Sequence, residues 1–150
     1  MLVWRLAKRA YAPLSGEGAR RSGGRWNSPG RAMVYCSEHL SLAALELLVH
    51  LSARNLPDDT TVYGIELDVE LVRPLDRRSL EAVERSGWSR AVTRGLGDRW
   101  LAEKRSLALA VPSVVVPREL NILIDPEHPD ARCLSIPHKE RFVFDPRLRG

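Results

Sequence analysis

One loop of the sequence places a cation and a large aromatic ring among residues that favour turns. The stretch Ser22–Gly30 reads SGGRWNSPG, and Arg25 and Trp26 are its only charged residue and its only aromatic ring. Glycine, asparagine, serine and proline make backbone bends easy, and loops carry many binding residues because a rigid scaffold can aim them. The stretch is therefore either a binding loop or an ordinary surface turn in which both side chains are incidental.

A single carboxylate lies in the most apolar helical segment. Glu46 is the only acidic residue between Glu38 and Asp58. A helix would place it on one face with Leu42, Ala43, Val49, His50 and Ala53. Such a carboxylate either faces water or is held in a partly desolvated site by a cation or by hydrogen bonds. For the second case, the arginine-rich loop upstream is a possible source of the cation.

Tyr35 and Ser113 are two further candidates. A tyrosine at a strand end can present its ring to a planar ligand while its hydroxyl stays solvated, or it can simply pack half-buried. Ser113 interrupts an apolar run after Pro112. Its hydroxyl can satisfy a backbone group at that bend, and no nearby His–Asp pattern makes it a triad nucleophile.

Other site classes have weaker support. Cys36 and His39 have the spacing of a zinc ligand pair, but His128, Cys133 and His138 lie far downstream and form no second compact pair, so we expect no metal. Neither a P-loop nor a G-x-G-x-x-G fingerprint occurs. A nucleic-acid site would need aromatics interleaved with a basic stripe, which Arg25-Trp26 alone does not supply.

Composition sets broad limits on the protein class. The 150 residues suit one domain, 1–150, and 44% hydrophobic with 28% charged residues is typical of a globular protein. We expect a cytoplasmic protein with reduced Cys36 and Cys133, because no apolar run approaches the roughly 20 residues that cross a bilayer and the N-terminus lacks the core of a signal peptide. The net charge of +4 fits an anionic small molecule, an acidic partner or nucleic acid equally well.

The periodicity predicts an α+β fold, with mixed β-sheets and flanking helices, because strands and helices mix without regular βαβ alternation. A Gly- and Arg-rich loop runs to about Arg31. Predicted strands are Val3–Ala7, Ala32–Cys36, Thr60–Val69, Leu107–Val116 with a break at Pro112, Asn121–Ile124 and Arg141–Phe144. Predicted helices are 42–54 with Ser41 as N-cap, Ser79–Arg85, and Ser89–Lys104 weakened by Gly95 and Gly97. The leucines of Leu42–Leu51 are expected in the core rather than in self-association.

Taken in order, these motifs resemble a known family. The chain carries Trp4-Arg5-Leu6, Gly23–Gly30 (GGRWNSPG), Val34–Ser37 (VYCS), Ala43–Glu46 (AALE), Val111–Pro117 (VPSVVVP) and Asn121–Pro129 (NILIDPEHP). It resembles the RES-domain toxins of bacterial RES–Xre toxin–antitoxin pairs, a family named for an arginine, a glutamate and a serine. Those letters fall on Arg25, Glu46 and Ser113, and the likeness runs over nearly the whole chain. One departure is Asp125, where the family pattern commonly has asparagine.

The resemblance implies a fold like that of the ADP-ribosyltransferases and an enzyme that consumes NAD⁺. It implies Glu46, Arg25, Ser113 and Tyr35 as catalytic residues. Glu46 would stabilise positive charge on the ribose. Residues expected to bind the dinucleotide are Arg5, Arg25, Tyr35, Ser113, Trp26 and Asn27. The two arginines would bind the pyrophosphate or the adjoining ribose, Tyr35 would flank the nicotinamide, and Ser113 would bond the nicotinamide or hold Glu46.

The resemblance also implies partners. A toxin that destroys NAD⁺ needs a cognate Xre-type helix-turn-helix antitoxin, which would cover the cleft with acidic or C-terminal residues opposite Arg5 and Arg25, within a complex that could be oligomeric. The acceptor of ADP-ribose, whether water, phosphate or a protein, is left open, and we expect no membrane and no direct nucleic-acid contact. Two alternatives stand beside this hypothesis: a basic nucleic-acid-binding domain and a catalytically silent interaction domain.

Overall fold

The protein is built around one bent, mixed β-sheet. The computed structural model describes residues 1–51 and 55–149. Seven strands form the sheet in the order β4-β5-β6-β2-β1-β3-β7, and all described pairings are antiparallel except β4 with β5. The strands are β1 (Leu2–Lys8), β2 (Val34–Ser37), β3 (Thr60–Glu66), β4 (Val72–Pro74), β5 (Ala108–Pro112), β6 (Leu120–Ile124) and β7 (Ser135–Arg141). The predicted α+β class is confirmed.

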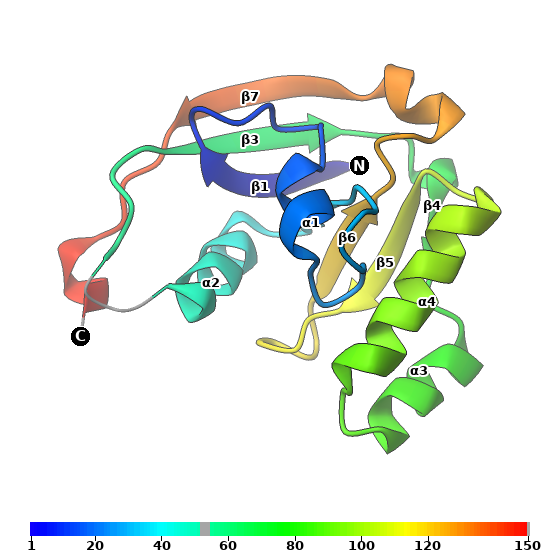
Figure 1. The fold of residues 1–150 in the computed structure, drawn as a ribbon. Coiled ribbons are helices and arrows are strands. Elements are labelled where there is room, and N and C mark those ends of the chain that lie inside the picture. The colour runs from blue at the N-terminus through cyan, green and yellow to red at the C-terminus, as the bar shows by residue number, and fades with distance from the viewer. Residues whose placement is uncertain (52–54, 150) are drawn as a thin grey trace.

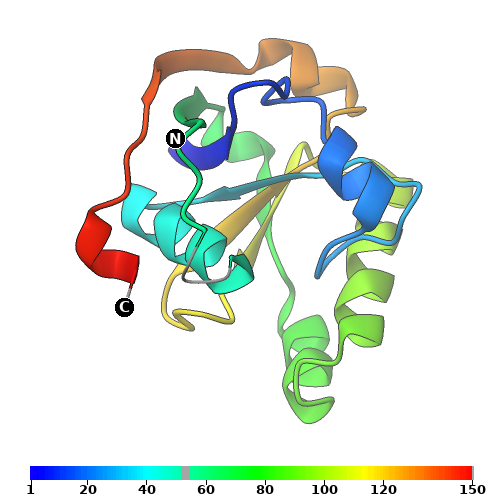
Figure 2. The same ribbon diagram turned by 60° about the vertical axis from the view of Figure 1, so that its left-hand side comes forward.

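The helices lie at separate places around this sheet. They are α1 (Glu17–Ser22), α2 (Leu40–His50), α3 (Arg77–Arg85) and α4 (Arg90–Glu103), with 3-10 turns at Val69–Leu71, Pro129–Cys133 and Pro146–Arg149. Figures 1 and 2 show α3 and α4 packed together at one end of the molecule, while α2 lies at the other end beside the C-terminal segment. Helix α2 therefore lies apart from α3 and α4 in the molecule.

The sheet bends where β1 meets β2. β1 pairs with β3 along its whole length, but its register with β2 consists of the single pair Trp4 and Ser37. In Figure 1, β1, β3 and β7 run across the molecule, whereas β5 and β6 run steeply down from them. Side chains from β1 and β2 therefore meet at an angle, and this angle positions the candidate site.

Both faces of β5 and β6 are buried. The side chains of successive strand residues point to opposite faces, and each face packs into its own hydrophobic cluster. Ala108, Ala110, Ile122 and Ile124 join one hydrophobic cluster with Val3, Val34 and Ile65. Leu109, Val111 and Leu123 join a second cluster with Val83, Trp100 and Leu101 of α3 and α4. Burial on both faces explains why these strands read as continuous apolar runs.

Several predicted boundaries are wrong at the sheet edges. The last strand is Ser135–Arg141, not Arg141–Phe144, because an edge strand that is exposed along most of its length tolerates Pro137 and charged residues. β3 ends at Glu66, and the short strand β4, which follows it, was not predicted. The predicted break at Pro112 is confirmed, since β5 ends there.

Two helical predictions are also corrected. α1 forms inside the stretch predicted as loop, where Glu17 pairs with Arg20 across one turn. α2 begins at Leu40 after His39, so Ser41 is not its N-cap. The helix follows β2 so directly that its first turn starts as soon as the chain leaves the strand. The end of the predicted 42–54 helix falls outside the described residues.

The apolar helix α2 is less buried than its sequence predicts. Leu42 is fully buried and Ala43 nearly so, but Leu45 is 42% exposed and Val49 58% exposed. The expectation that the leucines of this helix all serve the core is therefore wrong on its outer face. α2 packs mainly against β1 and β2.

Two further observations concern the described part of the chain as a whole. None of its helices combines the length and the apolar character that spanning a membrane requires. Cys36 is buried, Cys133 is exposed, and the two thiols are free.

Candidate functional site

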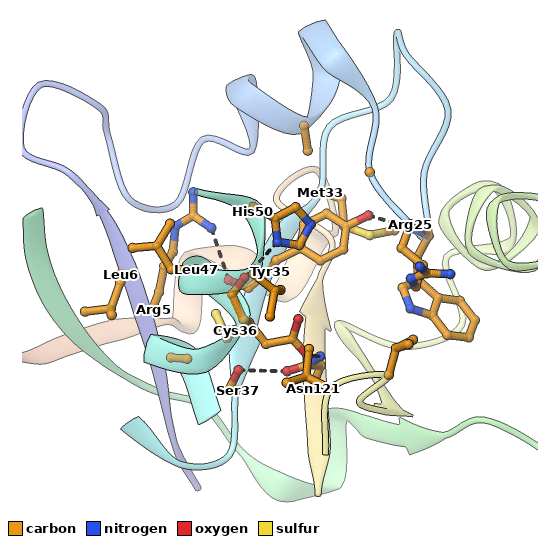
Figure 3. Close-up of a pocket in the computed structure, with 18 of the residues that line it drawn as sticks. Arg5, Leu6, Arg25, Met33, Tyr35, Cys36, Ser37, Leu47, His50 and Asn121 are labelled. Atoms are coloured by element: carbon orange, nitrogen blue, oxygen red, sulfur yellow. Dashed lines mark hydrogen bonds between the residues drawn. The ribbon is translucent and has the colours of Figure 1, made fainter. Parts of the chain in front are cut away.

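The bend of the sheet holds a cavity of about 790 Å³, within the usual size range of small-molecule sites. Its walls come from β1, the loop after α1, β2, α2, the end of β5, and β6. Figure 3 shows Arg5, Arg25, Tyr35, His50 and Asn121 around this cavity. Segments far apart in the sequence therefore converge on one site.

Glu46 projects from α2 into this cavity and is held through one of its two oxygens. Oε1 accepts hydrogen bonds from Ser113 Oγ at 2.7 Å and from Asn121 Nδ2 at 2.6 Å. Oε2 accepts none from the described residues, and Glu46 itself lines the cavity. The carboxylate is thus fixed in orientation while one oxygen stays available to a ligand.

Ser113 is fully buried and uses its whole hydrogen-bonding capacity. Its Oγ accepts from the backbone N–H groups of Val115 and Val116, both at 3.0 Å. A hydroxyl has one proton and two acceptor sites, so its proton is directed to Glu46. The turn after β5 therefore aims this serine at the carboxylate.

Asn121 and Ser37 extend the network and were missed by the sequence reasoning. Ser37 Oγ donates to Asn121 Oδ1 at 2.7 Å, which leaves the Asn121 amide N–H to face Glu46. The two residues are register partners on β2 and β6. Both are polar positions in otherwise apolar strands, and that is the only signal in the sequence that could have indicated them.

The partner expected for Glu46 is corrected by this geometry. The loop arginine was considered as the cation that would hold the carboxylate, but the described residues give Glu46 no ion pair. Neutral donors from β5–β6 hold it instead. The arginines of the cavity remain available for other anions.

Arg5 reaches the cavity from β1. Its Nη1 donates to the backbone carbonyl of Tyr35 at 3.1 Å. Its Nε is buried and has no hydrogen-bond partner among the described residues. Leaving a charged donor group unsatisfied is unfavourable, so a bound anion at this point would be stabilised.

Arg25 lies on the opposite wall, in the loop after α1. Its Nη1 donates to the carbonyl of Trp88 at 3.1 Å, and its own carbonyl accepts from Thr93 Oγ1 at 2.5 Å. Arg94 Nε donates to Gly24 O at 2.8 Å. Helix α4 and the turn before it therefore anchor this loop, and in the described structure neither Arg25 nor Arg5 forms a salt bridge.

The same loop is tied to β2 through Tyr35, which packs half-buried, the second of the two alternatives for this residue, with its hydroxyl bonded to the protein. It donates to Asn27 Oδ1 at 2.7 Å and accepts from the Trp26 N–H at 3.0 Å. Burial raises the pKa of Tyr35 to about 12. A side chain on the Gly24 Cα would collide with this hydroxyl, so glycine is required there.

Asn27 and Trp26 form the base of the loop. Asn27 is fully buried, and its Nδ2 donates to the carbonyls of Ala19, Ser28 and Arg31. Trp26 is 3% exposed and belongs to the second hydrophobic cluster, although it also contributes to the cavity wall. Both residues therefore shape the loop that carries Arg25.

His50 is a further cavity residue that the sequence reasoning did not assign to the site. It lies one helical turn after Glu46 on α2, and its Nδ1 contacts the Glu46 carbonyl oxygen at 2.7 Å. Spacing alone could have indicated it, because residues four apart share a helix face.

Three other positions were singled out in the sequence: Asp125, His39 and Cys36, of which Cys36 also lines the cavity. Asp125 is buried, accepts from Lys104 Nζ at 2.6 Å and from the Glu127 N–H at 2.9 Å, and so forms a turn despite replacing the asparagine of the family pattern. Among the described residues, the side chains grouped closely enough to share a cation are Glu38, His39 and Glu119. Cys36 and His39 do not come together in that group.

Comparison with known proteins places the chain in a family. The RES domain matches residues 2–145. The chain is 36% identical to "Toxin Res" of Yersinia enterocolitica, with 99% of this chain and 100% of that protein covered. It is 37% identical to "Prs ADP-ribosylating toxin" of Sphingobium sp. strain YBL2, with 97% and 94% covered.

A solved structure supports the same fold. The toxin–antitoxin complex MbcT–MbcA of M. tuberculosis contains a chain that matches with a TM-score of 0.75 at 19% identity, covering 99% of this chain and 86% of that one. The family resemblance inferred from GGRWN, the glutamate of α2 and the serine after Pro112 is confirmed. The protein belongs to the RES-domain family.

Proposed function

We propose that this protein is the toxin of a toxin–antitoxin pair and that it cleaves the bond between nicotinamide and ribose in NAD⁺. The observation that carries the proposal is the Glu46 carboxylate, which is fixed through Oε1 and accepts no bond at Oε2 from the described residues. Among the described residues that line the cavity, the other formal charges are those of Arg5 and Arg25. The names of the relatives, which include "Toxin Res" and "Prs ADP-ribosylating toxin", support it.

The chemistry needs a negative group beside the sugar. As the bond to nicotinamide breaks, positive charge grows on the ribose, and a preorganised carboxylate stabilises that charge. Oε2 of Glu46 would supply it, while Ser113 and Asn121 keep the group from turning away. Because the Ser113 hydroxyl is fully used in this network, the structure favours its role in holding Glu46 over contact with nicotinamide.

The rest of the cavity suits the rest of a dinucleotide. Guanidinium groups of Arg5 and Arg25 match the clustered anionic oxygens of a pyrophosphate. Tyr35, whose hydroxyl is engaged, can offer only its ring to a planar base. ADP-ribose then passes to water, phosphate or a protein hydroxyl.

A cavity of this kind requires control in the cell that makes it. We propose a cognate antitoxin of the Xre helix-turn-helix type that covers the opening with acidic or C-terminal residues facing Arg5 and Arg25. The solved relative MbcT was crystallised with MbcA as a toxin–antitoxin complex. Expression of this chain alone should arrest growth, and co-expression of the cognate antitoxin should restore it.

The decisive experiment follows nicotinamide release from NAD⁺ by the purified protein. We expect turnover by the wild type and a loss on the order of 10²-fold or more in Glu46→Gln. Glu84→Gln, at an exposed position of α3, is the matched control and should keep full activity. A folded wild type that releases no nicotinamide, yet binds DNA or RNA with affinity that falls steeply with salt, would establish the nucleic-acid alternative instead.

A further inference from the structure

We infer that His50 is the group that takes the proton from the acceptor of ADP-ribose, and that this acceptor is therefore a hydroxyl compound, water or an alcohol, rather than phosphate. The inference rests on the proposed cleavage of NAD⁺ and adds to it a residue and an acceptor class. It starts from the juxtaposition of His50 and Glu46 in one cavity.

The position of His50 is set by α2. Residues four apart lie on the same helix face, so the imidazole stands one turn beyond the carboxylate that would face the ribose. Both residues contribute to the cavity wall, and His50 is exposed at the surface of the protein. Figure 3 labels His50 among the residues that line this cavity. His50 and Glu46 therefore border the same cavity, in which the acceptor would approach the ribose.

The hydrogen bond to the backbone fixes which ring nitrogen can act. The carbonyl oxygen of Glu46 has no proton, so the 2.7 Å contact requires Nδ1 to be the donor. In the neutral ring Nε2 then carries the lone pair. Nε2 has no hydrogen-bond partner among the described residues and is free to accept a proton. The hydrogen bond at Nδ1 orients the ring, as in other histidine bases.

The step balances with a hydroxyl acceptor. The bond between ribose C1 and the nicotinamide nitrogen breaks with both electrons going to the ring nitrogen, so nicotinamide leaves neutral. The acceptor oxygen bonds to C1, and its O–H proton moves to Nε2 of His50 and from there to solvent. Phosphate dianion carries unprotonated oxygens and would need no such base.

The charges around His50 define the expected pH dependence. Within residues 1–51 and 55–149, the titratable and charged groups that share the cavity with it are Arg5 from β1, Arg25 from the loop, Tyr35 and Cys36 from β2, and Glu46 from α2 itself. Burial raises the pKa of both Tyr35 and Cys36 to about 12, so these two stay neutral. Protonation of an imidazole removes the lone pair that would accept the proton.

A purely structural role is the competing explanation. His50 occupies the last turn of α2, where a cation stabilises the helix end. Lysine could also supply that cation, but it could not take the proton from the acceptor. The substitution His50→Lys therefore separates the two explanations, and His50→Ala opens space for a small molecule to replace the ring.

The experiment measures nicotinamide release and the ADP-ribose products in three acceptors: water, methanol and inorganic phosphate. We expect wild-type turnover with water and methanol that declines at low pH. His50→Ala and His50→Lys should lose this turnover by about 10²-fold or more without change in thermal unfolding. Added imidazole should restore activity to His50→Ala, more strongly as pH rises, and should not affect the wild type.

Each other result overturns the inference. A wild type that uses phosphate alone excludes the hydroxyl acceptor. Wild-type activity in His50→Lys would establish the helix-end role. A wild-type pH profile in His50→Ala would show that His50 is not the base. In all three cases the wild type still consumes NAD⁺, so the proposed function survives. A wild type with no release of nicotinamide in any acceptor overturns both proposals together.

Discussion

Asn121 donates a hydrogen bond to Glu46 Oε1 at 2.6 Å, although 75 residues separate the two in sequence. The bond joins the inner strand β6 to the first long helix, and Ser113 donates to the same oxygen. The arrangement is asymmetric, because one carboxylate oxygen accepts both hydrogen bonds and the other accepts none from the described residues.

Asn121→Ala should lower NAD⁺ turnover by about 10- to 100-fold, the value of one hydrogen bond to a charged group, because Glu46 loses a constraint on its orientation. Asn121→Asp should lower it further, since two carboxyl groups would then compete for one site. In Asn121→Asp the residual activity should show an altered pH profile. Steady-state kinetics across pH test both, and equal rates in wild type and Asn121→Ala would remove this residue from the positioning of Glu46.

Arg25→Gln should raise the KM for NAD⁺ by about 10- to 100-fold, with a smaller effect on kcat, because a charge-assisted hydrogen bond contributes roughly 1.5–3 kcal/mol. Arg85→Gln, at an exposed position on α3, is the matched control and should leave both constants unchanged. An unchanged KM in Arg25→Gln would show that this guanidinium does not contact the dinucleotide.

Gly97→Ala should destabilise the protein and displace the loop that carries Arg25. A methyl group at Gly97 would overlap the backbone carbonyl of Trp26, whereas one at Gly95 meets no atom within 4 Å. Overpacking typically costs about 1–3 kcal/mol, while Gly95→Ala should be neutral or stabilising by up to about 1 kcal/mol through helix propensity. Urea unfolding of the two variants makes the comparison, and equal midpoints would contradict the close packing of α4 on the loop.

Tyr35→Phe should change how stability depends on alkaline pH. Burial raises the pKa of Tyr35 to about 12, above its unfolded value of about 10. The native state therefore favours the neutral phenol, and its contribution to stability is complete below about pH 10 and is lost as pH rises toward 12.

The measurement compares urea midpoints at pH 9 and pH 10.5. The wild type should lose more stability over this interval than Tyr35→Phe. The variant should also be less stable by about 1–3 kcal/mol at pH 9, because Asn27 Oδ1 and the Trp26 N–H lose their partner. An identical pH dependence in both proteins would show that the hydroxyl titrates as it does in solvent.

The sequence by itself determined the fold class, most element positions and the residues that name the family. Arg25, Glu46 and Ser113 stand in local motifs, and turn chemistry and apolar periodicity are local properties that a linear sequence carries. Strand edges were less predictable, because β7 is exposed along most of its length and reads as polar. Its assignment depends on a neighbouring strand rather than on its own residues.

Only the tertiary structure decided what holds the carboxylate and what surrounds it. Asn121 and Ser37 become partners through the register of β2 and β6, and Arg5 reaches the same cavity because the sheet bends at the single pair between β1 and β2. Hydrogen bonds act over about 3 Å, so they depend on positions in space that no spacing along the chain encodes. The types of the reactive groups are local information, and their orientation is a property of the packed sheet.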